Sequence, residues 1–431
     1  MKLIINNSYS RVLDININDF NELRTLLSYL PDNKANYFSR GYNYRRYLID
    51  KRGYFPTGLL HKVATFLTDK QVIVQDMRIK PKSTKNMFCL NSIHKPYPWQ
   101  IAAAEKMAKT HRGGIIAATG TGKSFLIALI ASRLNVKTLV VVPTLEIKSQ
   151  LIEAFSVILK GSDKNLIVEN IGSTKLKHLT DFDCLIVDEC HHAAAKTYRI
   201  LNKTAWNKAY YRFFVTATFF RNNEDENMLF EGVCGQPIYK LDYRSAIRNN
   251  YIVPVEAYYY DLPKQPVTGY TYNEVYQEAV VNNAIRNDII VNTMESLQNC
   301  NILCLVSRID HGKILSKMSG VPFVSGEDDE SRKYIQMFNK GEIKSLIGTT
   351  GVLGEGIDTR PAEYILIAGL GKAKSAFQQQ IGRGVRKYKD KKSCKIILFR
   401  DRSHKFLLRH YREQCKVLKE TYGVVPINLE E

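Results

Sequence analysis

Residues 117–124 read Ala-Ala-Thr-Gly-Thr-Gly-Lys-Ser, the most informative stretch of this 431-residue chain. They have the form of a phosphate-binding loop, with an apolar run before them and a helix-like stretch after them. Gly120 and Gly122 let the backbone turn tightly, so that its N–H groups can surround a polyphosphate. Lys123 can then reach the β- and γ-phosphates, and the Ser124 hydroxyl can bind Mg²⁺. The predicted nucleotide-binding residues are Ala118, Thr119, Gly120, Thr121, Gly122, Lys123 and Ser124.

A second string, Asp188-Glu189-Cys190-His191, directly follows the apolar run 184–187. An aspartate at the end of such a strand can hold Mg²⁺ directly or through water, and an adjacent glutamate can polarise the attacking water. We therefore predict that Asp188 is a metal ligand together with Ser124, and that Glu189 is the catalytic base. Combined with the phosphate-binding loop, this pair predicts an enzyme that hydrolyses ATP with Mg²⁺.

Strand-like and helix-like runs alternate along most of the chain. The expected strands are 115–116, 138–142, 166–168, 184–187 and 213–216 in the first half, and 302–306, 321–324, 345–347, 364–367 and 394–399 in the second. We expect helices over 273–297 and 404–422. Strands that alternate with helices at this spacing favour parallel sheets, so the fold class is α/β. The second half has no phosphate-binding loop of its own.

Three domains are expected from this organisation. Residues 251–266 carry three prolines and resemble a boundary between the two halves. We therefore predict a small basic α+β domain over 1–95, an ATP-binding lobe over 96–255 and a second lobe over 256–431.

The charge of the chain is strongly positive, with a formal net charge of +20. Residues 1–95 alone contain 9 Lys and 7 Arg against 6 Asp and 1 Glu. Such an excess indicates a polyanionic partner, although a solvated basic surface is the alternative. Within 37–55, arginines alternate with tyrosines, which suits phosphate contact combined with stacking. An amphipathic helix whose tyrosines pack inward explains the same pattern equally well.

Other bulk features point away from secretion and membranes. No run approaches the ~18 apolar residues needed to span a bilayer. The 8 cysteines are scattered, and Cys300 and Cys304 are the only close pair. We expect reduced thiols in a cytoplasmic protein, with no structural zinc and no membrane partner.

The ordered motifs resemble those of superfamily 2 helicases and translocases of the DExH type. Besides the two strings above, residues 379–386 match the pattern Q-x-x-G-R-x-x-R, residues 349–358 resemble motif V, and residues 96–100 resemble the Q-motif. The resemblance implies two RecA-like lobes. It also implies that Gln100 reads the adenine edge, while Tyr97 or Trp99 flanks the base or belongs to the core.

The same resemblance assigns roles to further residues. Arg383 and Arg386 would act as catalytic arginine fingers, stabilising charge on the γ-phosphate. Gly356 and Asp358 would help to bind the nucleotide. Residues that couple hydrolysis to strand binding would be His191, Thr216, Thr218 and Gln379. Contacts to nucleic acid would come from Pro143, Thr144, Gly172, Ser173, Arg308, Thr349 and Thr350.

The overall layout is similar to phage fork-remodelling helicases of the UvsW type. This implies an ATP-dependent DNA helicase or translocase that remodels branched DNA in recombination, repair or replication. Its partner would be branched or forked DNA, with one strand tracked by the lobes of a monomeric motor. A phage protein of this kind would work in the bacterial host cytoplasm. The alternatives are an RNA helicase, or the translocating motor subunit of a larger nuclease or packaging complex.

Overall fold

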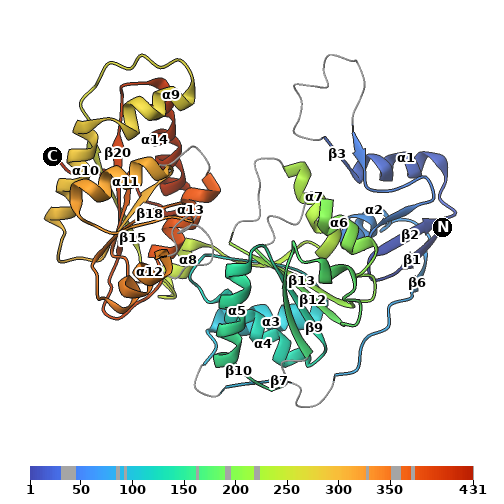
Figure 1. The fold of residues 1–431 in the computed structure, drawn as a ribbon. Coiled ribbons are helices and arrows are strands. Elements are labelled where there is room, and N and C mark those ends of the chain that lie inside the picture. The colour runs from blue at the N-terminus through green and yellow to red at the C-terminus, as the bar shows by residue number, and fades with distance from the viewer. Residues whose placement is uncertain are drawn as a thin grey trace. The chain divides into compact units, whose positions relative to one another are not determined.

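A computed structural model describes residues 1–30, 45–83, 88–91, 95–161, 165–189, 196–217, 224–326, 330–350, 361–369 and 374–430. Contacts between residues divide the chain into two compact units. The first unit consists of 1–117 and 122–241, and the second of 118–121 and 242–431. Each unit contains one large parallel sheet with helices around it (Figure 1).

The first unit is built on a six-stranded parallel sheet in the order β11-β9-β12-β13-β8-β14. Its strands are β8 (Arg112–Ala117), β9 (Thr138–Val142), β11 (Leu166–Asn170), β12 (Cys184–Asp188), β13 (Tyr211–Thr216) and β14 (Pro237–Leu241). The accompanying helices are α3 (Pro98–Thr110), α4 (Lys123–Leu134), α5 (Leu145–Ile158), η5 (Thr174–Lys177), α6 (Lys196–Lys203) and α7 (Glu224–Cys234). A two-stranded ladder joins β7 (Phe88–Leu90) to β10 (Leu159–Gly161).

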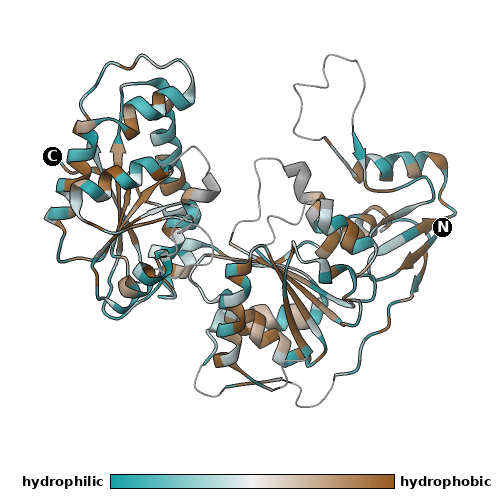
Figure 2. Ribbon diagram, in the orientation of Figure 1, coloured by the Kyte–Doolittle hydropathy of each residue, from teal (hydrophilic) through white to brown (hydrophobic). Residues whose placement is uncertain are grey.

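The strands of this sheet are buried on both faces, as in an α/β fold. Leu185 and Val187 of β12 share one core cluster with Tyr198 and Leu201 of α6. Figure 2 shows the same arrangement as hydrophobic strands inside each unit, with more polar residues on the surrounding helices. All five strands expected for the first lobe are present, and β14 is an additional one.

The N-terminal residues form a separate small sheet in the order β5-β2-β1-β6. The elements of this region are β1 (Lys2–Ile5), β2 (Tyr9–Leu13), α1 (Ile17–Leu26), β5 (Tyr54–Pro56), η3 (Thr57–Leu59), α2 (Leu60–Phe66) and β6 (Ile73–Asp76). A short ladder pairs β3 (Ser28–Tyr29) with β4 (Arg46–Tyr47). Buried and less buried residues alternate along β1 and β2, because one face of a strand packs on the core.

The Tyr/Arg-rich segment 37–55 is only partly described, since residues 31–44 lie outside the described ranges. Its described part contains strands β4 and β5, so the helical interpretation is wrong for residues 45–55. The side chains of Arg46 and Tyr47 are exposed, whereas Phe55 is fully buried. The segment therefore presents part of its basic and aromatic content to solvent.

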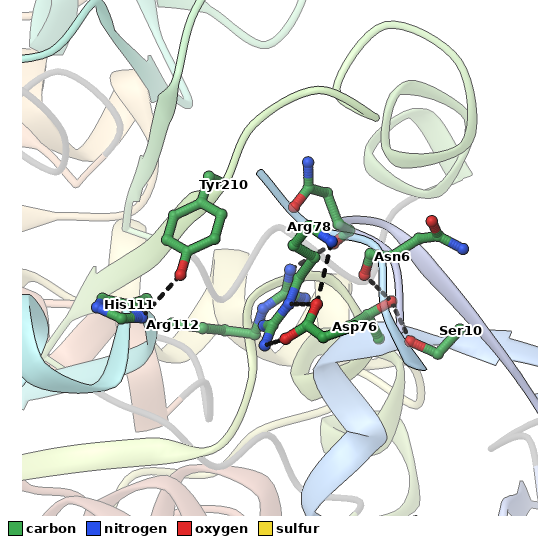
Figure 3. Close-up of polar contacts among 9 residues, drawn as sticks. Asn6, Ser10, Asp76, Arg78, His111, Arg112 and Tyr210 are labelled. Atoms are coloured by element: carbon green, nitrogen blue, oxygen red, sulfur yellow. Dashed lines mark hydrogen bonds and ion pairs between the residues drawn. The ribbon is translucent and has the colours of Figure 1, made fainter. Parts of the chain in front are cut away.

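Polar contacts at one junction join the N-terminal sheet to the six-stranded sheet of the first unit (Figure 3). Arg212 on β13 is fully buried, and it donates to Ser8 Oγ at 2.6 Å. Arg112, at the start of β8, donates to the carbonyl oxygen of Asn7. The Asn7 amide in turn donates to the carbonyl oxygen of Lys208 at 3.0 Å. These contacts fix residues 7–8 against the first unit's large sheet.

The second unit has a seven-stranded parallel sheet in the order β17-β18-β16-β19-β20-β15-β21. Its strands are β15 (Val255–Asp261), β16 (Ile302–Val306), β17 (Phe323–Val324), β18 (Ser345–Thr349), β19 (Tyr364–Ile367), β20 (Cys394–Arg400) and β21 (Ile427–Asn428). The helices are α8 (Tyr243–Arg248), α9 (Tyr272–Tyr276), η7 (Gln277–Val281), α10 (Ala284–Ser296), α11 (Ile309–Ser319), α12 (Ser331–Lys340), α13 (Lys374–Gly384), α14 (Lys405–Val417) and η8 (Leu418–Tyr422). All five expected strands are present, together with β15 and β21.

The boundary between the units differs in position from the expected one. The units divide between Leu241 and Asp242, whereas the sequence indicated 255/256, which is now seen to lie at the first residues of β15. Helix α8 belongs to the second unit because its Tyr243 packs against Tyr422, with ring centroids 4.6 Å apart. The division of the chain into three domains remains a prediction.

Candidate nucleotide-binding site

The phosphate-binding loop connects β8 to α4 in the way the sequence predicted. Gly120 and Gly122 have φ angles of +85° and +88°, a region that side chains other than glycine rarely adopt. Gly122 caps α4, which begins at Lys123. The hydroxyl of the buried Thr121 donates to the carbonyl oxygen of Ala118 at 2.7 Å, closing the turn. The backbone N–H groups at the start of α4 thus form a place where phosphate oxygens can bind.

Lys123 lies beside the predicted catalytic base. Its Nζ is 3.5 Å from Glu189 Oε1, and the lysine side chain is 10% exposed. Strand β12 carries Asp188 at its C-terminal end and pairs with β13, which pairs with β8, so the acidic pair and the loop share one edge of the sheet. Glu189 has a φ of +45°, an unusual value for glutamate, and its N–H donates to Asp188 Oδ1 at 3.0 Å.

The environment of Asp188 suits a divalent cation. Asp188 is 7% exposed, and burial together with the neighbouring charge of Glu189 raises its pKa to about 7, while Lys123 acts in the opposite direction. A buried carboxylate of this kind is stabilised in its ionised form by a bound cation. The residues present therefore fit Mg²⁺ at Asp188 and a nucleotide polyphosphate at the loop.

Gln100 connects the Q-motif to the phosphate-binding loop. Its Nε2 donates to the carbonyl oxygen of Gly122 at 2.9 Å, and its Oε1 accepts from the N–H of Tyr97 at 2.7 Å. Trp99 is 3% exposed and packs near Tyr239, so it belongs to the core, whereas Tyr97 is 40% exposed. Tyr97 is therefore the accessible one of the two aromatic residues predicted to flank the adenine base.

The four nucleic-acid residues predicted in the first unit lie at the same edge of the sheet as the phosphate-binding loop. Pro143 and Thr144 follow β9, and Gly172 and Ser173 follow the neighbouring strand β11, with Val142 and Asn170 as register partners. The hydroxyl oxygens of Thr144 and Ser173 accept helix-capping bonds at 3.3 Å. Each hydroxyl can still donate, which is the direction that a phosphate oxygen requires.

The predicted coupling residues are only partly described. Thr216 is fully buried at the end of β13, beside the strand that leads into the phosphate-binding loop. Gln379 lies half-buried on α13. His191, Thr218, Gly356 and Asp358 fall outside the described residues. Their roles remain predictions.

In the second unit, the predicted nucleic-acid residues Arg308, Thr349 and Thr350 lie at the C-terminal ends of strands β16 and β18. Arg308 donates to Gln277 Oε1 at 2.8 Å and Asn273 Oδ1 at 2.9 Å, so helix α9 and the π-turn η7 hold it in place. Thr349 ends β18, and the carbonyl oxygen of Thr350 accepts from Gln380 Nε2 at 3.3 Å. The latter bond joins motif V to helix α13.

The two predicted arginine fingers are adjacent to α13. Arg383 is 7% exposed in the last turn of the helix, and Arg386 is half-buried just beyond it. Their action on a nucleotide bound at the phosphate-binding loop remains a prediction.

Sequence reasoning missed several residues of the second unit. The buried Arg286 lies 3.4 Å from Asp401 and donates to the carbonyl oxygen of Ala368 at 2.7 Å, linking α10 to the ends of β19 and β20. Gln380, the neighbour of the predicted Gln379, contacts motif V through its bond to the Thr350 carbonyl oxygen. A lone arginine in a polar helix gives no sequence signal of burial, so Arg286 was not predictable from its surroundings.

Two helicase family models match the chain. The model for the type III restriction enzyme res subunit matches residues 93–178 and 166–221, and that for the helicase conserved C-terminal domain matches residues 285–388. The chain belongs to superfamily 2 of the helicases.

Individual relatives are distant. Putative helicase 22 of a Sulfolobus islandicus filamentous virus is 24% identical over 59% of the chain and 49% of that protein, so the chain spans about half the length of this relative. DNA 3′-5′ translocase XPB2 of Sulfurisphaera tokodaii is 24% identical over 69% of the chain and 80% of that protein.

Solved structures share the fold. A fragment of a putative HsdR subunit of a type I restriction enzyme from Vibrio vulnificus matches with a TM-score of 0.59 and 18% identity, over 78% of this chain and 68% of that one. UvsW of bacteriophage T4 matches over 99% of both chains with 19% identity and a TM-score of 0.46. The two RecA-like lobes expected from the sequence are confirmed by the two parallel sheets and by the fold shared with the HsdR fragment.

None of the described helices has the length and apolar character needed to cross a membrane. Within the described ranges, no three His, Cys, Asp or Glu side chains gather in a way that could hold a metal ion.

Proposed function

We propose that this protein is an ATP-dependent DNA translocase that remodels branched DNA by branch migration, fork regression or unwinding. The observation that carries the proposal is the placement of Lys123 beside Glu189, with the buried Asp188 next to them on one sheet edge. The similarity to DNA 3′-5′ translocase XPB2 supports the choice of DNA. The basic N-terminal residues support a polyanionic partner.

The site residues divide the chemistry among themselves. Bound Mg²⁺–ATP supplies the phosphoryl group that is transferred to water. Asp188 and Ser124 would hold the cation, and the loop backbone with Lys123 would bind the phosphates. Glu189 would accept a proton from the attacking water through its carboxylate. Arg383 and Arg386 would add positive charge where the transition state needs it.

Nucleic-acid binding would use the sheet edge that carries Thr144 and Ser173. The N–H and O–H groups after β9 and β11 can contact the phosphate backbone without reading sequence. Arg308, Thr349 and Thr350 would do the same in the second unit. The protein would act in recombination, repair or replication in the cytoplasm of a bacterial host. It would work as a single chain.

A second candidate is the motor subunit of a larger nuclease complex. The family model that matches the first lobe is that of the res subunit of type III restriction enzymes. A putative HsdR subunit shares the fold. In that case the chain would still translocate on DNA, but cleavage would come from a partner. A further alternative is that the protein is an RNA helicase rather than a DNA translocase.

The test is an ATPase assay with single-stranded DNA, forked DNA, a four-way junction and RNA as effectors. We expect forked or four-way DNA to stimulate turnover most, and Lys123→Ala to abolish it. Stimulation by RNA alone would contradict the choice of DNA. Stimulation by DNA without any strand displacement or branch migration would favour the motor-subunit candidate.

A further inference from the structure

Two adjoining hollows lie between the N-terminal sheet and helix α6, both within the first unit. Their volumes are about 440 and 560 Å³, and Tyr9 and Lys203 line both. We call this combined surface the tyrosine groove; besides these two residues its lining includes Tyr47, Tyr54, Arg199 and Lys208. Its volume is that of ligand-binding clefts.

Three tyrosines give the groove its aromatic character. Tyr47 is 42% exposed and Tyr54 is 38% exposed. The Arg24 guanidinium lies 4.0 Å from the centre of the Tyr47 ring, and that of Arg11 lies 4.7 Å from the centre of the Tyr54 ring. Each cation favours one orientation of its ring, because it is attracted to the ring face. The guanidinium covers one face of each ring, so a planar ligand would stack on the opposite face.

The charge of the groove is complementary to phosphate. Arg199, Lys203 and Lys208 line it, and none of them forms an ion pair with another described residue. The one carboxylate among the described lining residues is Asp50. Its Oδ1 already accepts from the N–H groups of Arg52 at 2.8 Å and Tyr54 at 2.9 Å. The basic side chains thus remain available to an anionic ligand.

We propose that the tyrosine groove binds an unpaired nucleotide of single-stranded DNA, with the base stacked on tyrosine and the phosphate on Arg199 or Lys203. Stacking on aromatic rings beside basic residues is how proteins bind single strands without sequence preference. A base pair cannot leave its duplex to enter such a hollow, whereas one splayed nucleotide can. This inference rests on the proposed function, because it takes the substrate to be branched DNA with an exposed single strand. It assigns the binding of that strand to the N-terminal region.

The groove is fixed in shape by the contacts between its two walls. Ser8 accepts from the buried Arg212 at 2.6 Å, and Asn7 donates to the Lys208 carbonyl at 3.0 Å. On the α7 side, a methyl group at Gly58 would lie 1.8 Å from the carbonyl oxygen of Glu231, so the surfaces touch directly. A preformed groove binds its ligand without the cost of ordering its walls.

The test compares variants in binding to fluorescein-labelled forked DNA, single-stranded DNA and a blunt duplex, without nucleotide. The key variant combines Tyr47→Ala and Tyr54→Ala; the conservative variant has Phe at both positions. Tyr270→Ala is the matched control, because Tyr270 is 94% exposed and lies in the second unit. We expect the alanine variant to bind forked and single-stranded DNA about tenfold more weakly, with blunt-duplex binding unchanged and the Phe variant close to wild type.

Photo-crosslinking then distinguishes the groove from strand contacts of the motor lobes. A 4-thiothymidine placed in the single-stranded arm should crosslink to a peptide that contains Tyr47 or Tyr54. Equal loss of fork and blunt-duplex binding in the alanine variant would overturn the inference, as would unchanged fork binding. In either case, DNA-stimulated ATPase activity of the wild type would leave the proposed function standing. If no DNA stimulates the wild type, the proposed function itself fails.

Discussion

The two carboxylates that follow β12 occupy different environments although they are adjacent in sequence. Asp188 is 7% exposed, whereas the Glu189 side chain is 24% exposed and lies 3.5 Å from Lys123. The buried acid is therefore suited to hold a cation, and the more exposed one to accept a proton from water. The sequence predicted both roles, since the apolar strand and the acidic pair form one local pattern. It could not predict the raised pKa of Asp188, because that depends on burial.

Asp188 should make the stability of the metal-free protein depend on pH. A pKa of about 7 lies above the ordinary aspartate value of 3.8, so the folded state binds this proton more tightly than the unfolded state. This stabilisation is present at low pH and is lost as the pH rises toward 7. Asp188→Asn avoids the loss, so its stability relative to wild type should increase between pH 5 and pH 8 by about 1–3 kcal/mol.

Thermal melts in EDTA at the two pH values measure this change. Asp181→Asn is the control, because Asp181 is exposed in an ion pair with Lys137 and its pKa is lowered. Added Mg²⁺ should reduce the difference at pH 8, since the cation stabilises the ionised carboxylate of the wild type. A pH-independent effect of Asp188→Asn on stability would contradict a raised pKa for this carboxyl group.

Glu189→Gln should separate nucleotide binding from hydrolysis. The amide keeps the size of the side chain but cannot accept a proton, so turnover should fall by roughly 10²–10⁴-fold. Binding of a fluorescent ATP analogue should remain close to wild type. Glu105→Gln, at an exposed glutamate on α3, is the matched control. Wild-type hydrolysis in the Glu189 variant would remove this residue from its proposed role.

At the scale of elements, the apolar strands that carry motifs were the easiest to predict. Strands near the edge of a sheet were the hardest. Strand β12 is a continuous apolar run, and its position was predicted correctly. Strand β15 was missed because prolines flank it on both sides, and a proline-rich stretch is typical of a linker. Its place beside β20 is decided by pairing with a strand far away in the sequence. Local pattern carries no information of that kind.

The contact between η3 and α7 gives a prediction at this scale. Gly58→Ala should destabilise the first unit by about 1–3 kcal/mol, because its methyl group would meet the backbone of Glu231 rather than a movable side chain. Urea unfolding of the variant and wild type measures the change. Gly320→Asn serves as control, since nothing lies within 4 Å of an added Cβ there and asparagine tolerates a φ of +70°. If Gly58→Ala were as stable as the wild type, η3 and α7 would be able to move apart at little cost.

At the scale of the molecule, the basic charge and the two parallel sheets were predicted, but the attachment of the N-terminal region was not. Arg212 lies inside the run Tyr-Arg-Phe-Phe-Val, where a single arginine gives no hint of burial. In the structure it binds Ser8, Asn202 at 2.5 Å and the carbonyl oxygen of Ala209 at 3.0 Å. The N-terminal residues therefore complete the interior of the first unit.

Deletion of residues 1–95 should for this reason lower the melting temperature of the protein as well as its DNA binding. Arg212 would lose an acceptor, and removing one partner of a buried charged group costs about 1–3 kcal/mol or more. Differential scanning fluorimetry measures the shift. A deletion variant with unchanged melting temperature would show that the first unit is independent of residues 1–95. Substitutions in the tyrosine groove test DNA binding without this complication.

The bond between Ser8 and Arg212 also bears on how the chain is made. The two residues are separated by 204 positions. A ribosome adds about 5–20 residues each second, so Ser8 is synthesised roughly 10–40 s before Arg212. During that interval the N-terminal sheet has no surface to dock on. Co-translational folding of the first unit must therefore finish at its N-terminal end, after β13 has emerged.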